Sequence, residues 1–266
     1  MTDTYIRRAG RPRTTPLFPT PDGVESIVVL SDIHIPYHDP AAVEVAFQIV
    51  DDLQPQRIII LGDLIDFYQI SSYDVDPARA TGYQLQSDLH AAQAFLQTLR
   101  SIVEPVTQIN YILGNHEDRL RKFLWKTPKI CGLESLALES LLNLAAYNIT
   151  MAPNSLLRSN MLFEHGSIIR KGSGYTAHAQ LSTRGISGIS GHSHRLSTIY
   201  HTDLSGVKLW AENGHLSTMQ PEYLQGQPDW QQGGSVLWLG PQTLPVIQQF
   251  HIHQGTCLFA GRTYKA

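Results

Sequence analysis

The stretch that decides the fold is Arg57-Ile58-Ile59-Ile60-Leu61-Gly62-Asp63-Leu64-Ile65-Asp66. Its unbroken run of isoleucine and leucine predicts a short central strand of a parallel sheet, buried on both faces. Gly62 lets the backbone turn sharply at the end of that strand. Asp63 is then expected just past the carboxyl end, where open α/β sheets bind their ligands. Asp66 follows within one turn, so the stretch predicts a strand that delivers two carboxylates to one crevice.

A second strand with the same ending lies upstream. Residues 26–30 (Ser-Ile-Val-Val-Leu) are followed by Ser31-Asp32-Ile33-His34. Alternation along an extended chain is expected to place Asp32 and His34 on the same side. A helix is predicted from Asp39 or Pro40 through about Asp52, because proline suits the first helical position. Strand, helix and strand together predict a right-handed βαβ unit.

The pattern of a strand followed by glycine and polar side chains continues along the chain. The strand predicted at 106–113 precedes Gly114-Asn115-His116-Glu117-Asp118, and the strand at 160–163 precedes Glu164-His165-Gly166. A short strand at 185–190 precedes Gly191-His192-Ser193-His194. Leucine spacing predicts helices at 85–100, 119–125 and 133–146. Antiparallel sheet is predicted for the remainder, with strands at 198–202, 207–212, 235–239, 246–253 and 257–259.

Length and composition limit the possible classes of protein. The chain has 266 residues, 42% of them hydrophobic, which suffices for one large α/β domain. Its net charge of −3 gives no overall attraction to nucleic acid or to anionic membranes, although a local basic patch stays possible. Only two cysteines are present, and we expect a reduced cytoplasmic location. Neither a signal peptide nor a membrane-length apolar run is seen, so no membrane partner is expected.

The first 23 residues differ from the rest. They contain four arginines and four prolines and show no periodic apolar pattern, which predicts a flexible basic arm. Such an arm either contacts a phosphate polymer or is a solvated tail. Residues 24–266 are then expected to form a single domain.

The polar residues at the predicted strand ends form one chemical set. They are Asp32, His34, Asp63, Asn115, His165, His192 and His194. Carboxylate, amide and imidazole ligands without cysteine suit divalent ions, with Mn²⁺ as our first choice and Fe, Zn, Ni or Co as alternatives. Seven ligands are too many for one ion but suit two that share a carboxylate. Such pairs, roughly 3.5–4 Å apart, catalyse phosphoryl chemistry.

In this order, the motifs resemble the signature of the calcineurin-like metallophosphoesterase superfamily. The matching blocks are Asp32-x-His34, Gly62-Asp63-x-x-Asp66, Gly114-Asn115-His116-Glu117, His165-Gly166 and Gly191-His192-x-His194. The resemblance covers roughly residues 26–215. It implies an α/β fold, a four-layer α/β/β/α sandwich in which two mixed β-sheets are flanked by helices.

The resemblance also implies roles for the site residues. One ion would be held by Asp32, His34, Asp63 and His194, and the other by Asp63, Asn115, His165 and His192. His116 would face the phosphate and protonate the leaving group or stabilise the transition state. Asp66 would accept a hydrogen bond from His116 and orient it. The implied activity is hydrolysis of a phosphoester by a metal-activated hydroxide.

Departures from the family pattern bear on the substrate. Phosphoprotein phosphatases of this superfamily continue the second block with an arginine that clamps a phosphomonoester, whereas Phe67 and Tyr68 stand here. Aromatic faces suit the second ester group of a nucleotide or nucleic-acid diester. Arg119 and Arg121 either contact phosphate or lie on a solvated helix face, and His178 is a further candidate for substrate contact.

We therefore predict a metal-dependent phosphodiesterase. Two alternatives stay open. One is a phosphatase acting on a small molecule or a phosphoprotein. The other is a scaffold that binds metal without catalysis. The expected partner is a phosphoester substrate, and a nucleic acid is compatible with this prediction.

Overall fold

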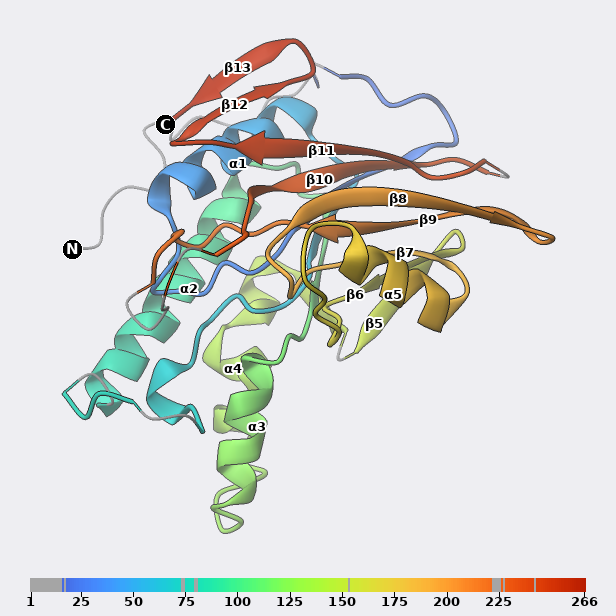
Figure 1. Cartoon of the computed structure of the whole chain (residues 1–266). Coiled ribbons are helices and arrows are strands. Elements are labelled where there is room, and N and C mark those ends of the chain that lie inside the picture. Colours follow the sequence, from blue (N-terminus) through green and yellow to red (C-terminus); the bar gives the residue numbers. More distant parts are fainter. Residues whose placement is uncertain are drawn as a thin grey trace.

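The computed structural model describes residues 16, 18–72, 75–78, 81–152, 154–221, 226, 228–241 and 243–266. Most of the predicted N-terminal arm lies outside these residues, so its character, and the division into an arm and one domain of 24–266, stay predictions. No helix among the described residues is long and apolar enough to cross a membrane. Figure 1 shows the course of the chain, in which two sheets pack together between helices.

The larger sheet contains the strand formed by Arg57–Ile60. It has six strands in the order β11-β10-β1-β2-β3-β4. β1, β2, β3 and β4 are parallel to one another, while β10 pairs antiparallel with both β1 and β11. The strands are β1 (Glu25–Leu30), β2 (Arg57–Ile60), β3 (Gln108–Ile112), β4 (Ile149–Ala152), β10 (Gln232–Leu239) and β11 (Val246–Ile252).

The second sheet has five strands in the order β5-β6-β7-β9-β8. β6, β7 and β9 are parallel, and β5 and β8 are antiparallel edge strands. These strands are β5 (Ser155–Arg158), β6 (Met161–Glu164), β7 (Ser187–Ser190), β8 (Leu196–Asp203) and β9 (Gly206–Asn213). A separate hairpin is formed by β12 (Thr256–Phe259) and β13 (Arg262–Lys265).

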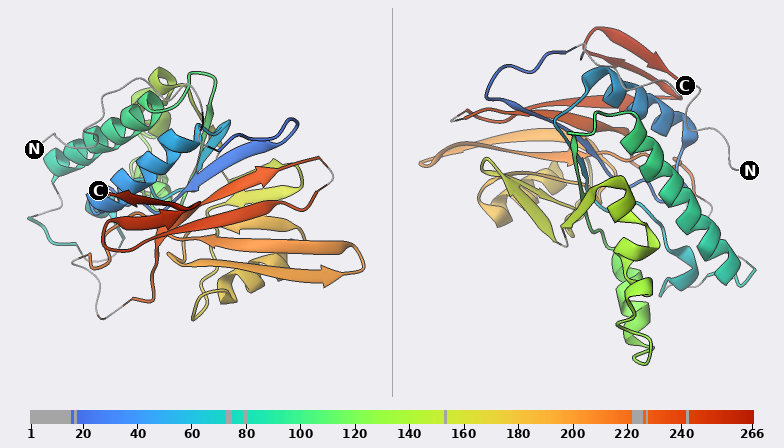
Figure 2. Two further views of the ribbon diagram at one scale, coloured as in Figure 1. Left: turned by 90° about the horizontal axis from the view of Figure 1, so that it is seen from above. Right: turned by 180° about the vertical axis from the view of Figure 1, so that it is seen from behind.

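Helices cover the outer faces of the two sheets, as Figure 2 shows from two further directions. The larger sheet is covered by α1 (Pro40–Leu53) and α2 (Gly82–Ser101), and the second sheet by α5 (Tyr175–Arg184). Asp39 begins α1 by accepting hydrogen bonds from the amides of Ala41 and Ala42. α3 (Glu117–Trp125) instead points away from the sheets.

Three buried apolar layers explain this order of helix, sheet, sheet and helix. Alternate residues of β2 face opposite sides, so Ile58 and Ile60 pack under the helices while Ile59 packs between the sheets. The helix-side core includes Phe47 of α1 and Phe95 of α2, whose ring centroids are 5.0 Å apart. The third layer, between the second sheet and α5, centres on Trp210. The predicted four-layer sandwich of two mixed sheets is thus confirmed.

One local prediction was wrong, and two helices were not predicted. The helix predicted at 133–146 is broken into η2 (Glu134–Leu136), α4 (Leu138–Leu141) and η3 (Leu144–Tyr147). Its leucines are spaced correctly, but Ala137 is extended and Asn143 adopts a left-handed conformation that interrupts the helical hydrogen bonds. The strands predicted in the C-terminal part pair antiparallel as expected, β8 with β9, β10 with β11 and β12 with β13, although β9 also pairs parallel with β7. α5, which connects the parallel strands β6 and β7, was not predicted. A further short helix, η1 (Tyr68–Ile70), was also not predicted.

Packing in the third layer gives a test of this fold. Gly188 of β7 lies directly against the fully buried ring of Trp210, and a methyl group at Gly188 would overlap that ring. Gly188→Ala should lower the free energy of unfolding by about 1–3 kcal/mol, the usual cost of overpacking. In a Trp210→Phe background, whose smaller ring leaves room, the same change should cost clearly less. Denaturant unfolding of the four proteins measures both costs, and an equal loss in the two backgrounds would contradict this packing.

Candidate metal centre

Several candidate ligands, which follow the strand ends of both sheets, have unusual backbone conformations. The φ angles of Asp32, His34, Asp63, His192 and His194 are all positive, between 51° and 67°. Left-handed conformations are costly for residues other than glycine and cluster at functional sites. Asp32 and His34 therefore converge through two left-handed residues and not, as predicted, through the alternation of an extended strand.

The predicted ligands come together from loops that are far apart in sequence. Asp32, His34 and His194 present ligand atoms that all lie within 4.8 Å of one another. Asp63, His165 and His192 form a second such group, and His34, Asp63 and His116 form a third. Each of these groups could hold a metal ion.

Asp63 lies between the first two groups. Its Oδ2 is 3.2 Å from Nε2 of His165 and 3.7 Å from Nε2 of His34. On the His165 side, the amide oxygen of Asn115 lies 3.0 Å from the same His165 nitrogen. One carboxylate is thus in reach of two clusters, which is the arrangement needed for a ligand shared by two ions.

The donor atoms fit divalent cations. Nε2 of His34 and Nε2 of His194 are 3.1 Å apart and both rings are buried. Nδ1 of His194 is buried, and no hydrogen-bond partner for it is found among the described residues. Two imidazole nitrogens facing each other beside a carboxylate need a proton or a cation between them. Nitrogen and oxygen donors of this kind suit Mn²⁺, Fe²⁺ or Zn²⁺.

Electrostatics at the centre favour bound positive charge. Burial works against the ionised form of Asp32, yet His194 lowers the pKa of that carboxyl below its usual value. Burial opposes protonation of His165, but Asp63 and Asp32 raise its pKa to about 10. His192 differs, because burial and the charge of His165 lower its pKa to about 4. The carboxylates therefore stay ionised and attract cations.

His116 and Asp66 lie at the edge of this cluster. Nδ1 of His116 is 2.8 Å from the backbone carbonyl of Asp66 and 3.3 Å from its carboxylate, and Nε2 is 3.1 Å from a guanidinium nitrogen of Arg119. A carbonyl only accepts and a guanidinium only donates, so the proton of His116 is on Nδ1 and Nε2 accepts from Arg119. Asp66 also binds Nδ1 of His34 at 3.2 Å. It therefore positions two histidines at once.

Glu117 contributes to the site although no role was predicted for it. Its buried carboxylate accepts hydrogen bonds from the amides of Asp63, Leu64 and Gly114 at 2.7–2.9 Å. It thereby fixes the loops after β2 and β3 against each other. In the sequence, Glu117 stands out only by its place in the third motif block. Its position along the chain does not reveal whether its carboxylate binds backbone amides or lies on the surface.

Glu212 of β9 is a second residue that was missed. Its side chain is fully buried and accepts hydrogen bonds from Ser193, at 2.5 Å, and from the amide of Gly174 at 2.8 Å. Ser193 stands between the candidate ligands His192 and His194, so Glu212 joins their loop to the start of α5. Nothing in the sequence around Glu212 indicated this position.

The residues predicted to contact the substrate lie in different parts of the molecule. Tyr68 and Arg119 line a cavity of about 590 Å³ together with His116, His34 and Trp230. Phe67 does not reach this cavity, because it is fully buried in the apolar core beneath the helices, and its predicted substrate contact was wrong.

Trp230 was also missed by the sequence analysis. Its ring centroid lies 4.4 Å from that of His194 and 5.4 Å from that of His215, which in turn stacks on His194 at 4.9 Å. His215 was not among the predicted site residues. The structure makes it a buried neighbour of a candidate ligand.

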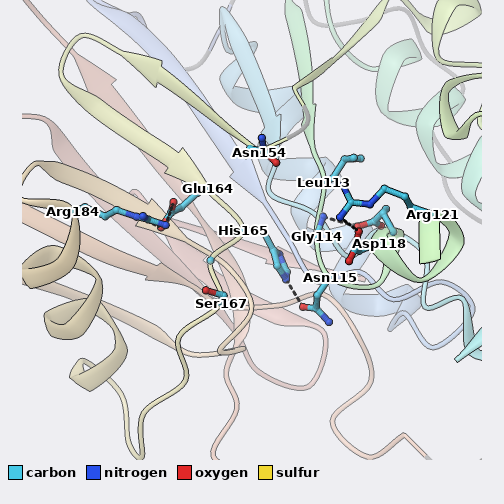
Figure 3. A pocket seen from close by; sticks show the side chains of 12 residues that line it. Leu113, Gly114, Asn115, Asp118, Arg121, Asn154, Glu164, His165, Ser167 and Arg184 are labelled. Carbon is cyan, nitrogen blue, oxygen red and sulfur yellow. Dashed lines mark hydrogen bonds and ion pairs between the residues drawn. The ribbon is translucent and has the colours of Figure 1, made fainter. Parts of the chain in front are cut away.

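Arg121 and His178 lie elsewhere. Arg121 lines a second cavity of about 420 Å³ on the outer side of Asn115 and His165, shown in Figure 3, where Arg184 also lies. His178 lines a third cavity of about 310 Å³ with His201 and Lys208. None of the described candidate ligands lines that third cavity, so His178 is not part of the centre.

Comparison with known proteins agrees with the fold and the cluster. The family model for calcineurin-like phosphoesterases matches residues 25–253, and the chain belongs to this family. Gene 54 protein of Mycobacterium phage D29 is 27% identical over 240 residues, covering 83% of this chain and 93% of that protein. The corresponding protein of Mycobacterium phage L5 is 25% identical over the same shares.

Solved structures with similar folds include Vacuolar Protein Sorting 29 from Cryptosporidium parvum. It has a TM-score of 0.49 and 13% identity, and the match covers 92% of this chain and all of that one. A conserved uncharacterized protein from Streptococcus pneumoniae, described as a predicted phosphoesterase, has a TM-score of 0.37 and 11% identity over 91% of this chain and 98% of that chain.

The position of Asp63 leads to a prediction about metal binding. Asp63→Ala should bind neither ion, because its carboxylate serves both clusters. His194→Ala and His165→Ala should each keep one ion, since each histidine belongs to one cluster. Metal content after gel filtration, measured by inductively coupled plasma mass spectrometry, checks this. The exposed variant Asp203→Ala is the control, and an Asp63→Ala protein that retains two ions would contradict the shared carboxylate.

Proposed function

We propose that this protein is a dinuclear metal phosphodiesterase. The observation that carries the proposal is the position of His116, which shares one cavity with His34, Asp63 and His194 while Asp66 fixes its Nδ1. A histidine held in this way beside two clusters of metal ligands can exchange a proton with a phosphoester. A purely structural metal site would have no use for such a group.

The ligand sets follow the two clusters, with Asp63 common to both. We assign Asp32, His34 and His194 to one ion and Asn115, His165 and His192 to the other. Bound divalent ions would withdraw charge from the phosphate and make a water nucleophilic at neutral pH. Chain residues supply the remaining chemistry.

His116 would act on the leaving group. When Arg119 turns from Nε2 of His116 to a phosphate oxygen, Nε2 can take up a proton from solvent and donate it to the leaving oxygen, which departs as an alcohol. Nδ1 keeps its hydrogen bond to Asp66 throughout, so the ring does not rotate. A diester needs this proton because its alkoxide leaving group is strongly basic.

Two features of the cavity favour a diester. Its volume of about 590 Å³ is that of a site for a small organic molecule, and the aromatic side chains of Tyr68 and Trp230 line it. These faces can contact the second organic group of a diester. The guanidinium of Arg119 is held by the carbonyl of Asp66 at 2.8 Å and its carboxylate at 3.3 Å, which reduces its charge toward a phosphate dianion.

Phosphomonoester hydrolysis is the alternative, and the same arginine favours it. Arg119 is the residue that could replace the missing arginine of the second block, because its side chain reaches the cavity. Arginine binds two phosphate oxygens at once and suits a monoester.

The variant His116→Ala distinguishes a role of His116 in metal binding from a role in catalysis. His116→Ala should keep its metal content and lose about 10²–10⁴ in kcat on a diester, the usual contribution of a general acid. The measurement is steady-state kinetics with metal analysis of the same sample. His201→Ala, an exposed histidine of β8, is the matched control and should behave as wild type. Loss of an ion in His116→Ala would show that His116 is a ligand.

Substrate class is tested by direct comparison. With Mn²⁺, kcat/KM for bis-p-nitrophenyl phosphate should exceed that for p-nitrophenyl phosphate. Arg119→Lys keeps the charge but loses the fork that binds two oxygens, so it should lower kcat/KM for the monoester by the larger factor. A clear preference of the wild type for the monoester would replace this proposal with the phosphatase alternative.

A further inference from the structure

The segment that leads away from His116 has an unusual composition. We call residues 119–133 the α3 arm, which consists of most of α3 and the turn that follows. It contains five basic residues and no acidic one, in a chain whose net charge is −3. Figures 1 and 2 show α3 projecting from the body of the protein, away from both sheets. The arm is therefore a local concentration of positive charge that begins at the candidate site.

Large apolar side chains on the α3 arm are exposed. The exposed fractions are 44% for Phe123, 59% for Trp125 and 52% for Leu133. The guanidinium carbon of Arg121 lies 4.9 Å from the centre of the Trp125 ring. Arg121 thus lies over one face of the exposed Trp125 ring, and an aromatic ring combined with an arginine in this way is used by proteins to bind the bases of single-stranded nucleic acids.

Little of the positive charge is neutralised. Arg121 and Lys122 share one carboxylate, that of Asp118. Lys126 and Lys129 are exposed, and no ion pair is found for either within the part of the chain that the structure describes. Apart from Arg119, the basic residues of the arm less the charge of Asp118 thus leave three net positive charges, on the exposed segment that contains Trp125.

The arm also has a suitable position. Trp125 is nine residues beyond His116, which corresponds to about 14 Å along a helix. A helically stacked DNA strand rises about 3.4 Å per nucleotide along its axis, so roughly four nucleotides span this length when stacked and fewer when the single strand is extended. Arg119 faces the cavity of the candidate centre and Arg121 faces the neighbouring cavity, and both lie between these two ends.

We propose that the α3 arm binds single-stranded nucleic acid, with a base stacked on Trp125 and phosphates bound by Lys122, Lys126 and Lys129. This inference rests on the proposed function, because it makes a polynucleotide the diester that reaches the candidate centre. Charge complementarity and the exposed tryptophan favour this partner. A base-paired duplex cannot use the aromatic face, since its bases are already stacked.

The test measures binding without relying on turnover. Fluorescence anisotropy of a labelled eight-nucleotide oligothymidylate is recorded with His116→Ala protein that contains its metals. Adding Trp125→Ala should weaken binding about 5- to 150-fold, the range for one stacked base. Adding Lys126→Glu should make the dependence of log K on log salt less steep by about 0.7, the value for one phosphate contact. Matched controls on other surfaces, Tyr200→Ala and Lys265→Glu, should change neither quantity.

Parallel measurements separate this inference from the proposed function. In a wild-type background, Trp125→Ala and Lys126→Glu should leave kcat/KM for bis-p-nitrophenyl phosphate unchanged. If the wild type bound the oligonucleotide but hydrolysed no diester, the proposed function would be wrong. The inference that the α3 arm binds single-stranded nucleic acid would still be supported.

Two results would contradict the binding of single-stranded nucleic acid by the α3 arm. Oligonucleotide affinity that both arm variants leave unchanged would overturn the inference. So would a dimer of the wild type that Trp125→Ala dissociates in sedimentation without affecting oligonucleotide affinity, which would assign the arm to a second copy of the chain.

Discussion

The candidate centre depends on the way in which Glu117 ties two loops together. Its carboxylate binds the amides of Asp63, Leu64 and Gly114, so the turns after β2 and β3 cannot separate. Gly62 and Gly114 allow the two turns to approach, because a side chain on Gly62 would lie 2.5 Å from the amide nitrogen of Gly114. This close approach places Asp63 between the histidines of the two sheets. A loss of Glu117 would release the carboxylate that both clusters share.

The burial of three carboxylates at the centre has an electrostatic consequence. Asp32, Asp63 and Asp66 are all at most 2% exposed, and burying several carboxylates together is costly unless cations accompany them. His34 and His165 compensate in part, and the carboxylates raise the pKa of both imidazoles, although burial acts in the opposite direction. Divalent ions would replace those protons and supply more positive charge. The α/β sandwich thus carries, at the edges of both sheets, a cluster of buried carboxylates and imidazoles that could hold divalent cations.

Much of the centre could be predicted from the sequence. Each candidate ligand directly follows a strand, and the ends of parallel strands meet at one edge, so Asp32, Asp63 and Asn115 were placed near one another without coordinates. The strands β1, β2 and β3 and the helix α1 followed from runs of apolar residues and a proline at the first helical position. These signals are local, and local signals are what a single sequence contains.

The remaining features depend on contacts that are distant in sequence. Phe67 looked like a substrate contact, but its side chain is in the core, because the left-handed backbone at that residue turns it away from the cavity. Trp230 and Glu212 reach the site only through the packing of the second sheet and its loops. The helix expected at 133–146 failed at Asn143, whose conformation no leucine spacing reveals.

Anomalous X-ray scattering from crystals soaked in Mn²⁺ tests the central claim most directly. A dinuclear centre should give two peaks roughly 3.5–4 Å apart, with the carboxylate of Asp63 between them. His34 and His194 should adjoin one peak, and His165 and His192 the other. A single peak, or two peaks that do not share Asp63, would contradict the two-metal centre.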